Sequence, residues 1–189
     1  MDWYKKWEDI DTEEQELEQE QRQENEDGQL KQVSNEDDLL RVIYRYKAIA
    51  THHFRNGNYL EAAEFYSRAL RYGKLRGESE GRRLAILLVN RAISRMKMAT
   101  DDNEIKSSSQ YYFELANLDC DKAVTIDCSY SKAFFKRAEI KMQHKRDFSG
   151  AIDDLNSAKE GFDYSQNSQL RSSINRRLSE CIKEIQSQA

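Results

Sequence analysis

The chain has no proline among its 189 residues, only seven glycines and only three cysteines. Without proline nothing in the sequence forces a helix to break, and scarce glycine leaves few positions for the tight turns of β-hairpins. The composition therefore predicts an all-α protein. Cys120, Cys128 and Cys181 are an odd number without C-x-x-C spacing, so we expect buried reduced thiols and neither a disulfide framework nor a zinc site.

Long apolar runs are also missing. No stretch approaches the roughly 18 apolar residues of a membrane-spanning helix, and the opening residues, MDWYKKWEDID, lack the apolar core of a secretory signal. We expect a cytoplasmic protein without membrane contacts. A nucleophile with its base, a phosphate-binding glycine loop and paired catalytic carboxylates are all absent from the sequence, so no enzymatic activity is predicted. His52, His53 and His144 have no partners at ligand spacing, so no metal or other cofactor is expected.

Charge is distributed unevenly along the chain. Residues 1–38 hold 15 acidic and 4 basic side chains, a net charge of -11, which leaves 19 acidic and 26 basic side chains, a net charge of +7, in residues 39–189. Residues 1–33 are predicted to be a mostly disordered acidic arm, because so few apolar side chains cannot offset the entropy of ordering. The arm is also suited to screen the basic domain against weak acidic ligands.

A short aromatic motif opens the arm, with Trp3 and Trp7 one helical turn apart. Two interpretations are open: the motif docks on a further protein, or it folds back on the domain's own groove. The basic domain is compatible with nucleic acid, but the excess charge is modest and no nucleic-acid-binding motif is present, so an acidic peptide is the better-supported partner.

Helical periodicity begins after Ser34, and helix hairpins then recur. Each hairpin carries small residues at matching places: Ala50, Ala62 and Ala69; Ala92, Ala116 and Ala123; and Ala138, Ala151 and Ala158. Small residues at fixed spacing let neighbouring helices approach closely, and their recurrence indicates a helical solenoid. We predict a domain over residues 34–189, with repeats at about 43–76, 85–128 and 131–164 and a capping helix at about 165–187. The capping helix is expected to pack a stripe from Leu170 to Ile185.

The stretches FRNGNYLEAAEFYSRAL, DCDKAVTID and SKAFFKRA resemble tetratricopeptide (TPR) repeats. The resemblance implies a right-handed solenoid of three hairpins with a groove lined by the first helix of each. The chain departs from the family pattern where Cys128 replaces the inter-repeat proline, where Lys145 stands at the expected turn glycine, and where extra residues, KLRGESEGRR and TDDNEIKSSSQY, lengthen two connections.

The resemblance extends to the co-chaperone subfamily, whose groove holds the Glu-Glu-Val-Asp tail of cytosolic Hsp70 and Hsp90 chaperones in a carboxylate clamp. The clamp uses Lys and Asn on the first helix, Asn on the third, and Lys followed four residues later by Lys or Arg on the fifth. The matching positions here are Lys47, Thr51, Asn90, Lys132 and Lys136. Residues four apart share a helix face, so each same-helix pair points to one side. Thr51 departs from the pattern because a hydroxyl lacks the donors of an amide.

Other residues near these positions admit two interpretations. Arg137 either assists the clamp or points away from it, Phe54 is a possible auxiliary contact, and at least one of Phe134 and Phe135 is expected in the core. A scaffold that binds another acidic or C-terminal peptide is the alternative function. The opening DWYKKWEDIDTEEQE is similar to a segment of RNA-polymerase-associated and sperm-associated-antigen adaptor proteins, which implies a role in assembling complexes such as axonemal dyneins.

Overall fold

The computed structural model describes residues 36–75, 81–100 and 106–188. The predicted acidic arm, with Trp3 and Trp7, lies outside the described residues. Regular structure within them is entirely helical: α2 (Glu36–Arg55), α3 (Tyr59–Leu75), α4 (Gly81–Ala99), α5 (Lys106–Ile126), α6 (Ser131–Ile140) continued by a π-helical turn (Lys141–Lys145), α7 (Phe148–Glu160), α8 (Phe162–Gln166) and α9 (Ser168–Gln188). The predicted all-α class is confirmed.

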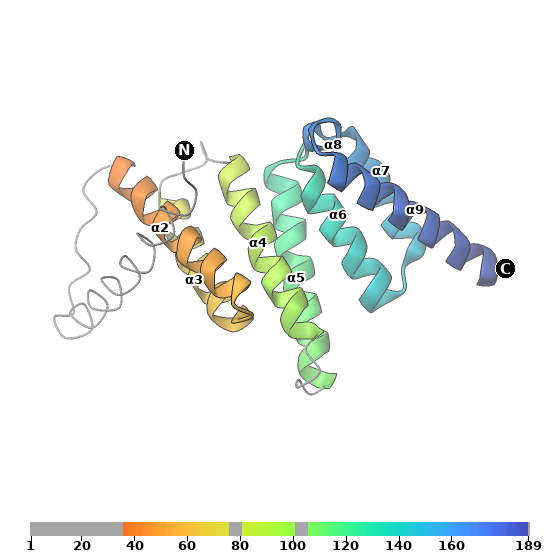
Figure 1. Cartoon of the computed structure of the whole chain (residues 1–189), viewed down its shortest axis with the longest axis horizontal. Helices are drawn as coiled ribbons and strands as arrows, with labels where there is room; N and C mark the ends of the chain where they lie inside the picture. The colour runs from red at the N-terminus through yellow and green to blue at the C-terminus, as the bar shows by residue number, and fades with distance from the viewer. Residues whose placement is uncertain (1–35, 76–80, 101–105, 189) are drawn as a thin grey trace.

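The helices pair into three hairpins, α2 with α3, α4 with α5, and α6 with α7, which lie side by side along the long axis of the molecule (Figure 1). Every helix from α2 to α7 packs against the next one in the chain, and α9 closes the row by packing against α7. This arrangement is the predicted solenoid of three hairpins with a capping helix.

The repeated alanines explain how the hairpins stack. All nine of these side chains have no exposed surface: Ala50, Ala62, Ala69, Ala92, Ala116, Ala123, Ala138, Ala151 and Ala158. A methyl group at each contact lets neighbouring helices approach closely, and the small residues recur at the same place in every hairpin. The prediction made from their spacing is therefore confirmed.

The second and third hairpins each contain an ion pair at the same place, where the first hairpin has apolar residues. Arg91, which precedes Ala92, donates two hydrogen bonds to the buried carboxylate of Asp119 at 2.9 and 2.7 Å. Arg137, which precedes Ala138, does the same to Asp154 at 3.0 and 2.6 Å. The corresponding positions in the first hairpin, Ile49 and Phe65, belong to an apolar cluster instead.

Two helices begin earlier than the sequence pattern indicated. We expected α4 from about Ala85, but it begins at Gly81, and α5 begins at Lys106, inside the stretch expected to form an expanded turn. The start of α4 is held by Arg82, which donates to Asp127 at 2.7 Å and to Asp163 at 2.6 Å. These partners are distant in sequence, so periodicity in the local sequence could not reveal them.

The capping region also differs in detail from the prediction. A separate short helix, α8, precedes α9, and only part of the expected apolar stripe is covered. Ile174 and Cys181 are fully buried against α6 and α7, whereas Ile182 and Ile185 remain 47 % and 40 % exposed. The part of the apolar stripe near the end of α9 therefore stays exposed.

The cysteine prediction is correct for two of the three residues. Cys120 and Cys181 are buried free thiols, and burial raises the pKa of both. Cys128 is a free but exposed thiol, so the expectation of burial was wrong for this residue. It lies in the connection between α5 and α6.

The first and third hairpins turn through residues with positive φ. Gly57 has φ of 83° and stands at the turn between α2 and α3, as expected. In the third hairpin the left-handed residue is Arg146, with φ of 51°, so placing Lys145 at the turn-glycine position was wrong by one residue. The π-helical turn contains one residue more per turn than an α-helix would, and it carries Lys145 within the helix.

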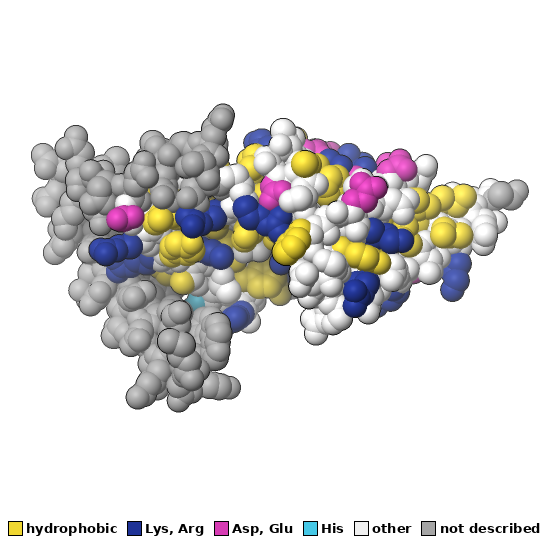
Figure 2. Space-filling model, turned by 90° about the horizontal axis from the view of Figure 1, so that it is seen from above, with side chains coloured by type: hydrophobic (Ala, Val, Ile, Leu, Met, Phe, Trp, Pro, Cys, Tyr) yellow, Lys and Arg dark blue, Asp and Glu magenta, His cyan; other side chains and the backbone are white. Residues whose placement is uncertain are grey.

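None of the helices in the described residues combines the length and apolar character needed to cross a membrane. The described surface mixes lysine and arginine side chains with hydrophobic ones, and Figure 2 shows both kinds side by side on one face.

Candidate peptide-binding site

Helix α6 sorts the side chains of KAFFKR into separate environments. Phe134 and Phe135 are both buried, which confirms the expectation that at least one belongs to the core. Lys132 and Lys136 are half-buried on one side of the helix. Residues four apart lie on the same helix face, so these two ammonium groups point in one direction.

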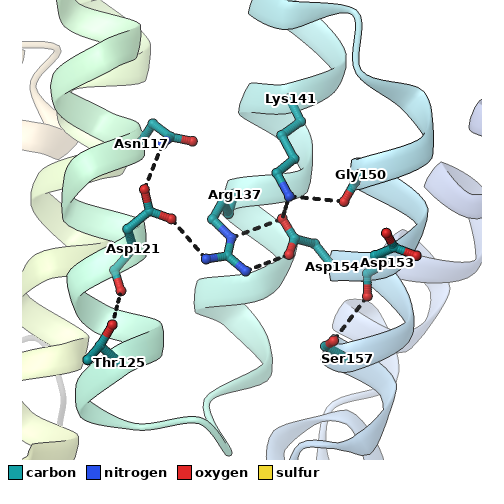
Figure 3. Close-up of polar contacts among 9 residues, drawn as sticks. All are labelled: Asn117, Asp121, Thr125, Arg137, Lys141, Gly150, Asp153, Asp154 and Ser157. Atoms are coloured by element: carbon teal, nitrogen blue, oxygen red, sulfur yellow. Dashed lines mark hydrogen bonds and ion pairs between the residues drawn. The ribbon is translucent and has the colours of Figure 1, made fainter.

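Arg137 points toward α5 and α7 (Figure 3). Besides its two bonds to Asp154, its guanidinium donates to Asp121 at 2.8 Å. Lys141 joins the network through Asp154 at 2.8 Å and the Gly150 carbonyl at 3.1 Å. These contacts favour the interpretation that Arg137 points away from the lysine pair, with its donors already satisfied by carboxylates of the fold.

Lys132 lies in a positive environment. Burial is the largest cause lowering the pKa of its ammonium group below 10.5, and the positive charge of Lys136 is the next. Lys47, on α2, lowers the pKa further, while Asp163 opposes the shift. Lys47 and Lys136, from two helices, are therefore close enough to Lys132 for their charges to act on it. Within the described residues, neither Lys47 nor Lys132 has an acidic side chain at ion-pairing distance.

Lys136 differs from the other two lysines because it has an acidic partner. Its Nζ lies 2.7 Å from Glu139, and it also sits 5.1 Å from the centre of the Phe135 ring. Glu139 is buried and accepts a second bond, at 2.9 Å, from Arg177 of the capping helix. Arg177 also pairs with Glu180 at 2.8 Å, but Glu180 is partly exposed to water. Arg177 therefore still partners the buried Glu139 when Lys136 turns to another carboxylate.

A polar network connects α2, α3 and α4 at the other end of the site. The hydroxyl of Thr51 donates to the Lys47 carbonyl at 2.8 Å and lies 3.1 Å from the hydroxyl of Tyr66. Because Thr51 has one proton and directs it at the carbonyl, Tyr66 is the donor in the second bond. Asn90 also acts on the Tyr66 phenol, and burial raises the pKa of that phenol despite both neighbours.

The network defines what each of its members can offer a ligand. Thr51 has no proton left, so in this arrangement it fixes the helices and does not donate outward. Since at most one of its two N–H groups can point at Tyr66, Asn90 keeps a donor for a ligand. Phe54 lies at the hairpin turn, where its ring packs 5.3 Å from the ring of Tyr59. That contact gives Phe54 a packing role.

Sequence reasoning missed three residues of this region: Tyr66, Glu139 and Arg177. Tyr66 carried a signal, since it stands between the paired alanines of α3 on a face that must be buried, and a buried hydroxyl needs a partner. Glu139 and Arg177 are separated by 38 positions, and no periodicity connects them. Groups of three His, Cys, Asp or Glu side chains that could hold a metal ion do not occur in the described residues.

The geometry of this fold matches solved TPR domains. The chain superposes on the first TPR domain of Spaghetti (RPAP3), bound to the HSP90 peptide SRMEEVD, with a TM-score of 0.57 and 19 % identity over 77 % of this chain and 94 % of the other. For the second TPR domain of human RPAP3, in complex with the HSP70 peptide SGPTIEEVD, the TM-score is 0.53 at 23 % identity, covering 74 % and 97 %. The Sgt2 TPR domain of Aspergillus fumigatus gives 0.56 at 20 % identity, covering 76 % and 79 %.

No family model matches the sequence. The described residues nevertheless have the fold of TPR domains, as the resemblance in the sequence implied. At these identities the likeness establishes the fold, and the function has to be argued from the site itself.

Proposed function

We propose that this chain is an adaptor that binds the acidic C-terminal tail of Hsp70 or Hsp90 chaperones through Lys47, Asn90, Lys132 and Lys136, with Thr51 in a supporting role. The main support for this proposal is that three lysine ammonium groups from α2 and α6 lie near one another. Two of them, Lys47 and Lys132, have no acidic partner in the described residues. Like charges held together destabilise the free protein and favour a ligand that brings negative charge.

A C-terminal aspartate is suited to this arrangement because it presents two carboxylates close together. Lysine ammonium groups donate charge-assisted hydrogen bonds to them, each contributing about 1.5 to 3 kcal/mol. The remaining N–H of Asn90 adds a neutral donor. Two of the solved TPR domains with this fold hold peptides that end in EEVD, which makes such a tail the natural ligand to test.

The test is a titration of the full chain with a peptide ending in Glu-Glu-Val-Asp and with the same peptide amidated at its C-terminus, followed by calorimetry. We expect amidation to weaken binding at least tenfold, since 1.4 kcal/mol corresponds to a factor of ten. Lys132→Ala should cause a similar loss. Lys159→Ala, which removes an exposed lysine at the end of α7, is the matched control and should leave affinity unchanged.

Equal binding of the free-acid and amidated peptides would contradict a clamp for the terminal carboxylate. It would favour the alternative, a TPR scaffold that recognises acidic side chains within another peptide. Loss of binding in Lys159→Ala to the same extent as in Lys132→Ala would instead indicate attraction by net charge alone.

A more specific role, the chaperone-assisted assembly of complexes such as axonemal dyneins, is supported only by the resemblance of DWYKKWEDIDTEEQE to adaptor proteins. Those residues lie outside the described part of the chain. Co-purification of dynein chains with the tagged full-length protein, and their loss when residues 1–15 are deleted, is the outcome this role requires.

A further inference from the structure

A groove runs along α3 on a different part of the molecule from the lysine site. Two hollows of about 530 and 410 Å³ lie between α3, α4 and α5 and share the side chains of Ser67 and Arg71. The two hollows are adjacent at these residues and are together called the α3–α5 groove. None of the predicted clamp residues lines it.

Exposed apolar side chains collect in the α3–α5 groove. The described residues include eight large hydrophobic side chains that are exposed, and four of them line it: Leu60, Tyr111, Leu118 and Ile126, with exposures between 42 % and 57 %. Buried Leu70, Leu88 and Met98 contribute to the same surface. A gathering of exposed apolar groups in a depression is typical of a docking surface.

Cations border this apolar surface. Arg71 and Lys122 are exposed, and within the described residues no carboxylate pairs with either. The other arginines that line the groove on α4, Arg91 and Arg95, are both bound to Asp119 and belong to the fold. Two carboxylates, Glu64 and Asp121, also line the groove, and Asp121 is already bound to Arg137. Basic side chains outnumber these two, so the groove fits an occupant that is apolar on one side and acidic on the other.

The start of this chain has that chemistry. Trp3, Trp7 and Ile10 are spaced for one face of a helix, and Leu17 continues the same stripe two turns further along. The positions between them are rich in Asp and Glu. Residues 18–35 connect this segment to α2 and reach up to about 60 Å when extended, or about 25 Å as a flexible coil. Helix α2 spans about 30 Å and packs against α3, so the groove is within reach.

We propose that residues 3–17 dock in the α3–α5 groove of the same molecule as an amphipathic helix. Trp3, Trp7 and Ile10 cover its apolar side chains, and the acidic residues that follow lie near Arg71 and Lys122. The docked segment leaves the lysine site uncovered, so the chain can hold its own arm and a separate acidic ligand at once. The proposal does not depend on the proposed function.

Tryptophan fluorescence of the full chain tests this proposal directly, because Trp3 and Trp7 are the only two tryptophans. We expect emission at shorter wavelength, and weaker quenching by neutral acrylamide, than in the urea-unfolded chain. Leu118→Arg should move both signals toward their unfolded values while the far-ultraviolet circular dichroism stays native. Arg71→Glu should change both signals in the same direction. This second variant tests the proposal even if Leu118→Arg unfolds the protein.

Ile182→Arg is the matched control, since Ile182 is similarly exposed but lies on α9, away from the groove. It should leave tryptophan emission unchanged. The proposal is wrong if the wild-type tryptophans are quenched as strongly as in urea, or if both groove variants leave them protected. It is also wrong if Lys132→Glu alone exposes them, which would place the arm on the lysine site. Protection that disappears on dilution would mean that a second copy supplies the arm.

Discussion

The first and third hairpins have the same architecture but are held together by different interactions. In the first, Ile49 and Phe65 occupy an apolar cluster, and a glycine makes the turn. In the third, the corresponding positions are Arg137 and Asp154, which form a buried ion pair, and an arginine makes the turn. The comparison shows that the spacing of small residues sets the solenoid, while the chemistry between them is free to vary.

The two hairpins also differ in what they contribute to the site. The first presents Lys47 and holds Thr51 in a neutral hydrogen-bonded network with Tyr66. The third presents Lys132 without an acidic partner in the described residues and Lys136 bound to Glu139. We expect the first to limit how many donors the site offers, and the third to set its charge.

Removing the acidic member of the third hairpin's pair should produce the largest effect. Asp154→Ala leaves Arg137 and Lys141 without their buried partner, which costs about 3 to 5 kcal/mol of unfolding free energy. Urea denaturation of the full chain measures this. Combining Arg137→Ile with Asp154→Phe reproduces the first hairpin's residues and should recover much of the loss; if it is as unstable as Asp154→Ala, the two hairpins are not interchangeable.

Restoring an amide in the first hairpin should strengthen ligand binding. Thr51→Asn replaces a hydroxyl whose proton is used on Lys47 with two N–H donors, one of which can reach a carboxylate. One additional charge-assisted bond contributes about 1.5 kcal/mol or more, which corresponds to roughly tenfold tighter binding of the EEVD peptide. Calorimetry with the free-acid peptide measures it, and unchanged affinity would show that Thr51 does not limit the site.

The third hairpin's contribution should appear as a pH dependence. The pKa of Lys132 lies below 10.5 in the folded chain. Charged Lys132 therefore destabilises the fold at pH values below its folded-state pKa. This loss of stability disappears as the pH rises from the folded-state pKa to 10.5. An anionic ligand favours the charged form, so peptide affinity should fall by up to about tenfold per pH unit above the folded pKa. Lys132→Arg should move the fall to higher pH because guanidinium stays charged, and identical profiles would exclude Lys132 as the titrating group.

Substitutions at the two turns should change stability by about 1 kcal/mol and in opposite directions. Gly57→Ala places a side chain in the left-handed region and should destabilise the fold by about 1 to 2 kcal/mol, although no neighbouring atom would obstruct its Cβ. Arg146→Gly removes the same strain and should stabilise the fold by up to about 1 kcal/mol. Lys145→Gly is the control, since a glycine inside the π-helical turn should destabilise; thermal unfolding separates the three.

The helical class and the stacking of the hairpins could be predicted from the sequence alone, because the alanine spacing is a local pattern that does not depend on the details of packing. The sequence also located the clamp candidates, since their spacing along each helix fixes which side chains share a face. It could not place Arg137, whose orientation depends on carboxylates from α5 and α7, or extend α4 to Gly81, which Arg82 holds through Asp127 and Asp163.

The tertiary structure alone decided which cations are available to a ligand. Lysine and arginine look alike in a charge count, but Arg137 and Lys136 have acidic partners while Lys47 and Lys132 have none in the described residues. It also decided that Thr51 uses its hydroxyl within the fold and that apolar side chains gather along α3. Each of these outcomes depends on contacts between residues distant in sequence, and such contacts exist only once the hairpins have stacked.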